Sequence, residues 1–324
     1  MTEITRLTAV QLSEAIHSRS VTCVEVMDAF LARINALNPD LNALICLLPP
    51  DACLAMAREA DKQLSGGESA GWLHGIPIAI KDLFNAQDFV TACGSPLFSS
   101  VMAQQDDPHV ARLRAAGALV IAKTNVPEAG LGGHTHNSLY GLTRSGLDRN
   151  LTAGGSSGGA ATAVSSHMLP LADGSDMMGS LRTPAAFQGI VGFRASIGAI
   201  PAALDADPLG LGLTGIGPMA RNVSDVSALF NTLCNAPTAH RQNPVGHSGQ
   251  LKGLRIGWLG DAAGHWPMTD GILAQCQRGL ENLQELGAHV DLCLLSFPLA
   301  DLWDCWLTLR QRSLLPDRSL YDDP

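Results

Sequence analysis

The strongest constraint on the fold is a glycine-rich loop that runs straight into a helix pattern. Residues 151–168 read "LTAGGSSGGAATAVSSHM", with four glycines around Ser156 and Ser157 and an alanine-rich run after them. Glycine adopts backbone conformations that other residues avoid, so such a loop lets the backbone approach another group closely. Four interpretations are open at this point: a flexible linker, a tight turn, a phosphate cradle, or a loop that holds a catalytic serine.

Composition limits the class of protein. The 324 residues are 46% hydrophobic, which is typical of a globular protein with a large core. The net charge is −9 and no cluster of Lys and Arg is longer than a pair, so we expect no nucleic-acid partner. The eight cysteines form no CxxC pair and are expected to be reduced. Because no run of 18 apolar residues and no signal-peptide pattern occurs, the sequence predicts a cytoplasmic protein with no membrane partner.

Apolar periodicity divides the chain into a helical start and an α/β remainder. Thr22 and Glu25 form a capping-box pattern before apolar residues at helical spacing, so residues 1–65 are expected to be mainly helical. Strand and helix patterns alternate over residues 66–324, which predicts an α/β core with helices on both faces of a sheet. No linker rich in Pro, Gly or Ser interrupts the pattern, and the sequence predicts a single domain, residues 1–324.

The C-terminal part repeats the strand–helix–strand pattern. "KGLRIGWLG" and "AHVDLCLL" flank a helix pattern over residues 270–286, so this part is expected to extend the same sheet. A last helix pattern, "LADLWDCWLTLRQR", carries Trp303, Trp306 and Leu307 at helical spacing. An apolar stripe of this kind needs a partner, so the tail is a candidate surface for oligomer formation.

Two motif interpretations of the glycine loop lack their expected context. A P-loop needs a Lys and then a Ser or Thr directly after its glycines, and "GGSSGGAAT" has neither. "GALVIAKT", residues 117–124, is nearer to that pattern, but Ala122 replaces a glycine and the run reads as a strand. "GGSSG" also matches the GxSxG nucleophile elbow, with Ser156 as the nucleophile. The elbow follows a strand, whereas the preceding "SGLDRNLTA" is polar and turn-forming.

A second serine offers a different nucleophile. Ser180 lies in "GSDMMGSLRTPAAFQ", just before a helix start, where unpaired N–H groups and the helix dipole stabilise negative charge. The N–H groups of Met177, Met178 and Gly179 are the candidate oxyanion hole. Lys81 is the candidate base, because it ends the apolar run "GIPIAI" and burial lowers the pKa of a lysine. The alternative is a lysine at a strand end that faces solvent.

Four motifs together resemble the amidase signature family, in the order that the family shows. They are "GIPIAIKD" at 75–82, "AKTNVPE" at 122–128, "GGSSGG" at 154–159 and "GSDMMGSLRTPAAFQGIVGFR" at 174–194. The resemblance is dense from about residue 74 to 222 and looser on both sides. It implies the amidase signature fold, an α/β fold with a mixed central sheet flanked by helices on both faces, after a mainly helical N-terminal segment.

The resemblance also implies a Ser-Ser-Lys triad. Lys81 matches the base, Ser156 matches the serine that the family calls cis-Ser and uses as a proton relay, and Ser180 matches the nucleophile. Supporting roles are implied for three more residues. Ser157 is expected to hold the loop through a hydrogen bond, and Asp176 and Arg182 are expected to pair with each other. In this interpretation the glycines let a serine hydroxyl bridge the lysine and the nucleophile.

Three features depart from the family pattern. Met178 stands where a glycine is usual, and a positive φ there would cost about 1–3 kcal/mol of strain. Ala153 and Ala195 replace prolines that are common in the family. The chain is also shorter than family members, so we expect it to lack part of the C-terminal region that completes the sheet.

The stretch "GGHTHN", residues 132–137, allows two interpretations. His134 and His136 are candidate metal ligands, but glycine-rich stretches follow the KTN segment in similar family members, which favours a loop near the substrate pocket. We therefore expect no metal and no cofactor.

The function that the resemblance implies is hydrolysis of the C–N bond of a small-molecule carboxylic amide through an acyl-Ser180 intermediate. Two alternatives stay open: a shortened or non-catalytic homologue, and a partner-dependent glutaminase-type subunit of an amidotransferase. Neither "GGHTHN" nor the net charge selects the last of these.

Overall fold

The computed structural model describes residues 3–201, 212–234 and 251–314. Its helices and strands fall into two compact units, Met1–Gln242 and Asn243–Pro324. Each unit is described by itself. Among the described residues, no helix is long and apolar enough to cross a membrane.

The first unit begins with helices, as predicted. After the short 3₁₀ turn η1 come three helices: α1 (Ala9–His17), α2 (Cys23–Leu41) and α3 (Pro50–Ser65). The capping box at the start of α2 is present, since Thr22 Oγ1 accepts from Glu25 N and the Glu25 carboxylate accepts from Thr22 N. The apolar stripe of α2 is buried from Val26 to Ile34. This burial fixes one face of α2 against the core.

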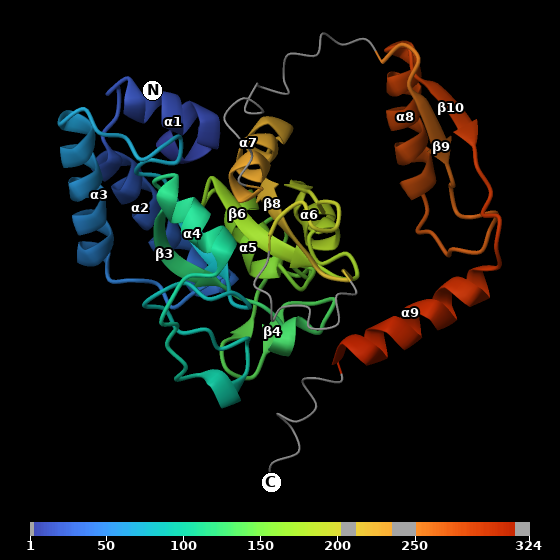
Figure 1. The fold of residues 1–324 in the computed structure, drawn as a ribbon, viewed down its shortest axis with the longest axis horizontal. Helices are drawn as coiled ribbons and strands as arrows, with labels where there is room; N and C mark the ends of the chain where they lie inside the picture. The colour runs from blue at the N-terminus through green and yellow to red at the C-terminus, as the bar shows by residue number, and fades with distance from the viewer. Residues whose placement is uncertain (1–2, 202–211, 235–250, 315–324) are drawn as a thin grey trace. The chain divides into compact units, whose positions relative to one another are not determined.

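Two three-stranded sheets form the centre of the first unit (Figure 1). In the first sheet, β2 (Pro77–Lys81) runs parallel to β3 (Leu119–Thr124), which pairs antiparallel with β1 (Leu44–Ile45). In the second sheet β8 lies between antiparallel partners, and its strands are β6 (Leu171–Asp176), β7 (Val191–Gly192) and β8 (Gly215–Ala220). Because β2 packs beside β6, the two sheets make a mixed layer.

Helices pack against this layer, and the predicted α/β class is confirmed. Helix α5 (Gly158–Ser165) contacts β2, β3 and β6, α3 contacts β3, and α7 (Val223–Leu233) contacts β8. The remaining elements of the unit are α4 (Pro108–Ala115), α5 (Gly158–Ser165), α6 (Arg182–Gln188), α7 (Val223–Leu233), the short strands β4 (His136–Asn137) and β5 (Gly141–Leu142), and the 3₁₀ turns η1 (Ile4–Arg6), η2 (Pro96–Phe98) and η3 (Glu128–Gly130).

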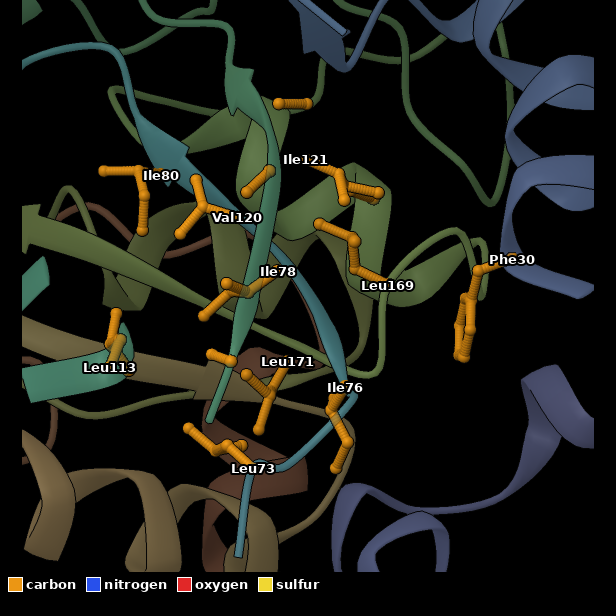
Figure 2. Packing of buried hydrophobic residues seen from close by; sticks show 14 of the residues in the cluster. Phe30, Leu73, Ile76, Ile78, Ile80, Leu113, Val120, Ile121, Leu169 and Leu171 are labelled. Carbon is orange, nitrogen blue, oxygen red and sulfur yellow. The ribbon is translucent and has the colours of Figure 1, made fainter. Parts of the chain in front are cut away.

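The core lies where these layers meet. Figure 2 shows Ile78 and Ile80 near Val120, and Ile76 near Leu171, with Ile121 and Leu169 in the same cluster. All of these side chains are buried. The predicted strands "GIPIAIKD" and "GALVIAKT" are thus confirmed as β2 and β3, whereas β6 and β8 were not predicted.

The second unit contains the strand–helix–strand pattern that the sequence predicts. Strand β9 (Arg255–Trp258) pairs parallel with β10 (His289–Leu292), and α8 (Ile272–Glu285) connects them. Helix α9 (Leu299–Leu314) follows. The expectation that this unit continues the central sheet of a single domain stays a prediction.

Candidate active site

Strand β2 carries Lys81 into the interior of the first unit. All five residues of the strand are buried, and Lys81 is 0% exposed. Apolar residues and the parallel partner β3 bury the strand, so its last side chain is also shielded from water. The alternative of a lysine that faces solvent is therefore wrong.

Three serine hydroxyls surround the Lys81 amine. Lys81 Nζ lies 2.8 Å from Ser156 Oγ, 2.8 Å from Ser157 Oγ and 2.9 Å from Ser175 Oγ. The carbonyl oxygen of Ser175 is 3.4 Å away. A neutral amine has two N–H donors and one lone pair, so one of these hydroxyls can donate to it.

Burial sets the charge state of this amine. Desolvation lowers the pKa of Lys81 to about 7, and the negative charges of Asp173 and Asp176 oppose the shift. Near neutral pH a large fraction of the amine is therefore neutral and able to accept a proton. This is the property that a general base needs.

The glycine loop places Ser156 beside the lysine. Gly154 has φ +76°, a conformation that favours glycine. A side chain at Gly155 would meet the carbonyl oxygen of Gly132 at 2.8 Å, so the backbones approach too closely for any other residue. The Gly155–Ser156 peptide bond is cis. The loop is thus a holder for a serine rather than a linker.

The nucleophile elbow is not formed around Ser156. Helix α5 begins at Gly158, but no strand leads into the loop from residues 143–157, where only the Arg144 and Thr152 bridge is present. The strand–turn–helix context that the elbow requires is absent from this described segment.

Ser180 lies in the turn between β6 and α6. The N–H of Ser157 donates to the carbonyl oxygen of Ser180 at 3.2 Å, which ties this turn to the glycine loop. Ser180 is partly exposed, and its hydroxyl forms no hydrogen bond with another described residue. The fold therefore places the Ser180 backbone beside the glycine loop, whose Ser156 hydroxyl contacts Lys81. That these three residues act as a triad stays a prediction.

Asp176 organises the turn before Ser180. Its carboxylate accepts from Gly179 N at 2.7 Å and Leu181 N at 3.2 Å, and it forms a two-pronged pair with Arg182 at 2.9 and 3.0 Å. Burial alone would raise the pKa of Asp176, but the Arg182 and backbone hydrogen bonds hold this pKa below its usual value. The expected pairing of Asp176 with Arg182 is present.

The same carboxylate changes the predicted oxyanion hole. Gly179 N–H is engaged by Asp176, so it is not free for a substrate oxygen as the structure stands. The N–H groups of Met177, Met178 and Ser180 donate to no acceptor among the residues that the structure describes. They are the donors that this turn offers.

The condition for backbone strain at Met178, a positive φ at that residue, is not met. Met178 is not among the described residues with positive φ, whereas Gly179 has φ +106°. Glycine thus stands where the turn needs the left-handed region. The Met178 side chain is 57% exposed, so it projects outward from the turn.

Sequence reasoning missed three residues beneath the site. Ser175 contacts Lys81 Nζ directly. Asp173 accepts from Lys81 N at 2.9 Å and pairs with His109 at 3.3 Å. The signal was the alternation in "ADGSD", which places the side chains of Asp173 and Ser175 on one face of a strand.

Ser157 and the "GGHTHN" stretch support the loop. Ser157 Oγ contacts Lys81 Nζ and the carbonyl oxygen of Ser175, which is the loop-holding bond expected of it. Thr135 Oγ1 donates to Gly154 O and accepts from Gly158 N, so this stretch packs on the glycine loop. His134 Nδ1 contacts Thr152 Oγ1. Within the described ranges, no group of three His, Cys, Asp or Glu is arranged to hold a metal ion.

Comparison with known proteins agrees with this geometry. The amidase family model matches residues 25–300. A glutamyl-tRNA(Gln) amidotransferase subunit from Chloroflexus aurantiacus is 36% identical, over 89% of this chain and 60% of that protein. The subunit of the same name from Acidothermus cellulolyticus is 35% identical, over 90% and 59%. The chain spans about 60% of the length of these curated relatives.

Solved structures show the same fold. A bacterial aryl acylamidase of the amidase signature family has a TM-score of 0.82 and 26% identity, over 93% of this chain and 64% of that one. The peptide amidase of Stenotrophomonas maltophilia has a TM-score of 0.75 and 28% identity, over 90% and 62%. With the motifs, the buried lysine–serine cluster and these matches in agreement, the chain belongs to the amidase signature family of hydrolases.

Proposed function

We propose that this protein hydrolyses the C–N bond of a small-molecule carboxylic amide through an acyl-serine intermediate. The observation that carries the proposal is the contact between Lys81 Nζ and Ser156 Oγ at 2.8 Å, inside a site where Lys81 has a pKa of about 7. A base of this strength, joined to a hydroxyl relay, activates a serine nucleophile near neutral pH.

Proton transfer accompanies each bond change. Ser180 Oγ attacks the amide carbon and gives its proton to Ser156, which passes its own proton to neutral Lys81. The carbonyl oxygen becomes an oxyanion, held by N–H groups of the turn. As the C–N bond breaks, the proton returns from Lys81 through Ser156 to the leaving nitrogen. Water then attacks the acyl-enzyme and gives its proton to Lys81 through Ser156. The proton returns to Ser180 Oγ as the carboxylic acid leaves.

The surrounding residues support these reaction steps without exchanging protons. Ser157 and Ser175 orient the Lys81 amine, and the Asp176–Arg182 pair fixes the turn that carries Ser180. Met177 and Met178 are our first two oxyanion donors, with Ser180 N–H as a third. Gly179 N–H joins them only if Asp176 releases it. The proposed chemistry uses no metal and no cofactor.

The proposal is tested by assaying the purified chain on a panel of small aryl and aliphatic amides. We expect release of ammonia or amine from at least one amide, and loss of that activity in Ser180→Ala. Leu151→Ala, an exposed position on the same unit, is a matched control that should retain activity. An inactive chain that is folded by circular dichroism would instead support a non-catalytic homologue.

A second candidate is a glutaminase-type subunit of an amidotransferase. The relatives at 35–36% identity, which carry the name of such a component, favour it. In that case we expect glutamine hydrolysis to require added partner subunits, whereas a free-standing amidase acts alone. Comparing glutamine with aryl amides, with and without the partners, separates the two.

We also propose that the protein acts in the cytoplasm and associates through α9. The cysteines lack disulfide spacing, and Leu302 and Trp303 of α9 are exposed. Sedimentation of the wild type and of Trp303→Gln tests the second point. A wild type that is monomeric at all concentrations contradicts it.

A further inference from the structure

Strand β6 brings two buried carboxylates close to Lys81, and they differ in their partners. Asp176 is offset by Arg182, and Arg194 Nε lies 3.6 Å from its Oδ1. Asp173 is 0% exposed and has no guanidinium or ammonium partner among the described residues. Its Oδ1 accepts from the Lys81 backbone N–H at 2.9 Å, and its Oδ2 lies 3.3 Å from His109 Nε2.

His109 holds Asp173 from the other side. The ring is 0% exposed, and it stacks edge-on against Phe84 with centroids 4.5 Å apart. Nδ1 of His109 is buried without a hydrogen-bond partner in the described part of the chain. A charged ring would therefore bury a second N–H that has no acceptor, whereas the neutral Nε2–H tautomer donates to Asp173 and leaves its negative charge in place.

The other charged groups near β2 are balanced among themselves. Lys123 of β3 lies 3.4 Å from Asp82, and it also donates to the carbonyl oxygens of Phe84 and Val90. Helix α5, which packs on β2, has no ionisable side chain. Asp173 is thus the carboxylate beside Lys81 whose charge no cation among the described residues offsets.

We propose that Asp173 is the counter-charge of Lys81 during the reaction, and that His109 is the positioning residue that holds it. The inference rests on the proposed amide hydrolysis, in which Lys81 takes up a proton in a fully buried site. A buried ammonium is costly without a compensating negative charge. Asp173 supplies that charge without contacting the substrate and without exchanging a proton.

Burial and the two nearby carboxylates act on the pKa of Lys81 in opposite directions, and together they place it at about 7. Burial lowers the pKa of Lys81. The carboxylates of Asp173 and Asp176 raise it again, and Asp173 has the larger effect of the two. With this balance the amine is neutral often enough to start the reaction and basic enough to take the proton. Removal of the Asp173 charge shifts the balance toward a weaker base.

The first test is the pH profile of kcat/KM for Asp173→Asn. Asparagine keeps an oxygen for Lys81 N–H but removes the charge. We expect the pH below which kcat/KM falls to drop by about one unit, with a several-fold lower plateau. Asp225→Asn is the matched control, since Asp225 is also 0% exposed and accepts two backbone N–H groups of α1. It should lose stability without moving the profile.

His109→Gln tests whether the His109 ring is neutral. Glutamine can donate to Asp173 and carries no charge, so the profile should stay within a few tenths of a unit of wild type. A profile that moves to higher pH means that His109 was charged and contradicts the assignment. Asp173→Ser carries the same expectation as Asp173→Asn where the asparagine variant does not fold.

A second readout needs no activity. The free energy of unfolding is measured against pH for wild type, Asp173→Asn, Lys81→Met and the double variant. The free energy of unfolding of wild type minus that of Lys81→Met should rise with pH from about 7. When both proteins also carry Asp173→Asn, this rise should begin at lower pH. If Asp173→Asn shifts this rise but the protein hydrolyses no amide, Asp173 is still the counter-charge of Lys81 and the proposed function is rejected. If the protein is active but Asp173→Asn leaves the pH profile of kcat/KM unmoved, or if Asp173→Asn does not shift the rise, the counter-charge role of Asp173 is overturned.

Discussion

The two units use the same alternation of strands and helices but bury very different amounts of it. In the first unit every residue of β2 and β6 is buried. In the second unit neither β9 nor β10 has a buried residue, and α8 has none either. Among residues 251–312 only Ala262 and Ala288 are buried. A periodic pattern therefore predicts which element forms, but burial depends on what covers it.

The second unit contains a pocket of about 420 Å³ that is lined in part by apolar residues. Strand ends and α8 line it, with Trp258, Leu273, Leu292 and Leu294 among the lining residues. In the first unit, isoleucine, valine and leucine side chains pack into a buried cluster between strands and helices (Figure 2). The Lys81–Ser156 cluster lies in the first unit, where close packing holds side chains in place.

The largest expected difference between the units concerns their lysines. Lys81→Ala should lower kcat/KM by about 10² to 10⁴, the usual loss for a general base. Lys252→Ala, at an exposed position of the second unit, should leave it unchanged. Kinetics on the amide that the panel identifies, with circular dichroism as a folding control, measures both. Equal activity of the two variants would remove Lys81 from the mechanism.

A matched pair of leucines tests the packing difference. Leu171 of β6 is 0% exposed, and Leu171→Ala should lower the free energy of unfolding by about 2–5 kcal/mol. Leu292 of β10 is 74% exposed, and Leu292→Ala should change it by less than about 0.5 kcal/mol. Urea denaturation gives both values. A cost for Leu292 as large as that for Leu171 would show that β10 is covered in solution.

The pH dependence separates a buried base from exposed histidines. Because Lys81 must be neutral to act and has a pKa of about 7, kcat/KM should rise with pH up to about 7 and then level off. Below that value it should fall about tenfold per pH unit. His289→Asn, an exposed histidine of the second unit, should leave the profile in place. A pH profile that shifts in His289→Asn would show that His289, and not Lys81 alone, controls the pH dependence of kcat/KM.

A smaller loss than that of Leu171→Ala is expected at a helix start. Thr22→Ala removes the capping box of α2 and should cost about 1 kcal/mol. Thr22→Ser should restore most of this, because serine offers the same oxygen. Helix α8 begins at Ile272, after Gly271, without a side-chain cap, so it has no equivalent contribution to lose. Thermal unfolding of the three proteins is the measurement, and an unchanged midpoint in Thr22→Ala would contradict the capping assignment.

Much of the fold could be predicted because its elements carry ordinary signals. The capping box at Thr22 and the apolar runs of β2 and β3 are local patterns that the structure confirms. Strands β6 and β8 escaped prediction because they contain glycine, aspartate and proline in place of strand-forming residues. Gly174 shows the reason, since a side chain there would meet Leu181 at 2.7 Å and Ser157 at 2.9 Å.

The sequence pointed to the buried Lys81–Ser156 contact through motifs that resemble a family, and it missed the residues beneath that contact. The catalytic roles of Lys81, Ser156 and Ser180 stay predictions. Ser175 and Asp173 were missed because strand β6 itself was missed. Strain at Met178 depended on a positive φ there, and the turn takes its positive φ one residue later, at Gly179. Motifs identify reactive groups, but the partners of those groups depend on strand pairing.

Labelling with a serine-directed phosphonate tests the central claim most directly. The reagent forms a covalent bond with an activated serine, and mass spectrometry identifies the modified residue. We predict that wild type is labelled at Ser180, that Ser156→Ala is labelled slowly at the same residue, and that Ser180→Ala is not labelled. Label on Ser156 in the Ser180→Ala protein would contradict the account, because it would make Ser156 the nucleophile and leave Lys81 as its direct base.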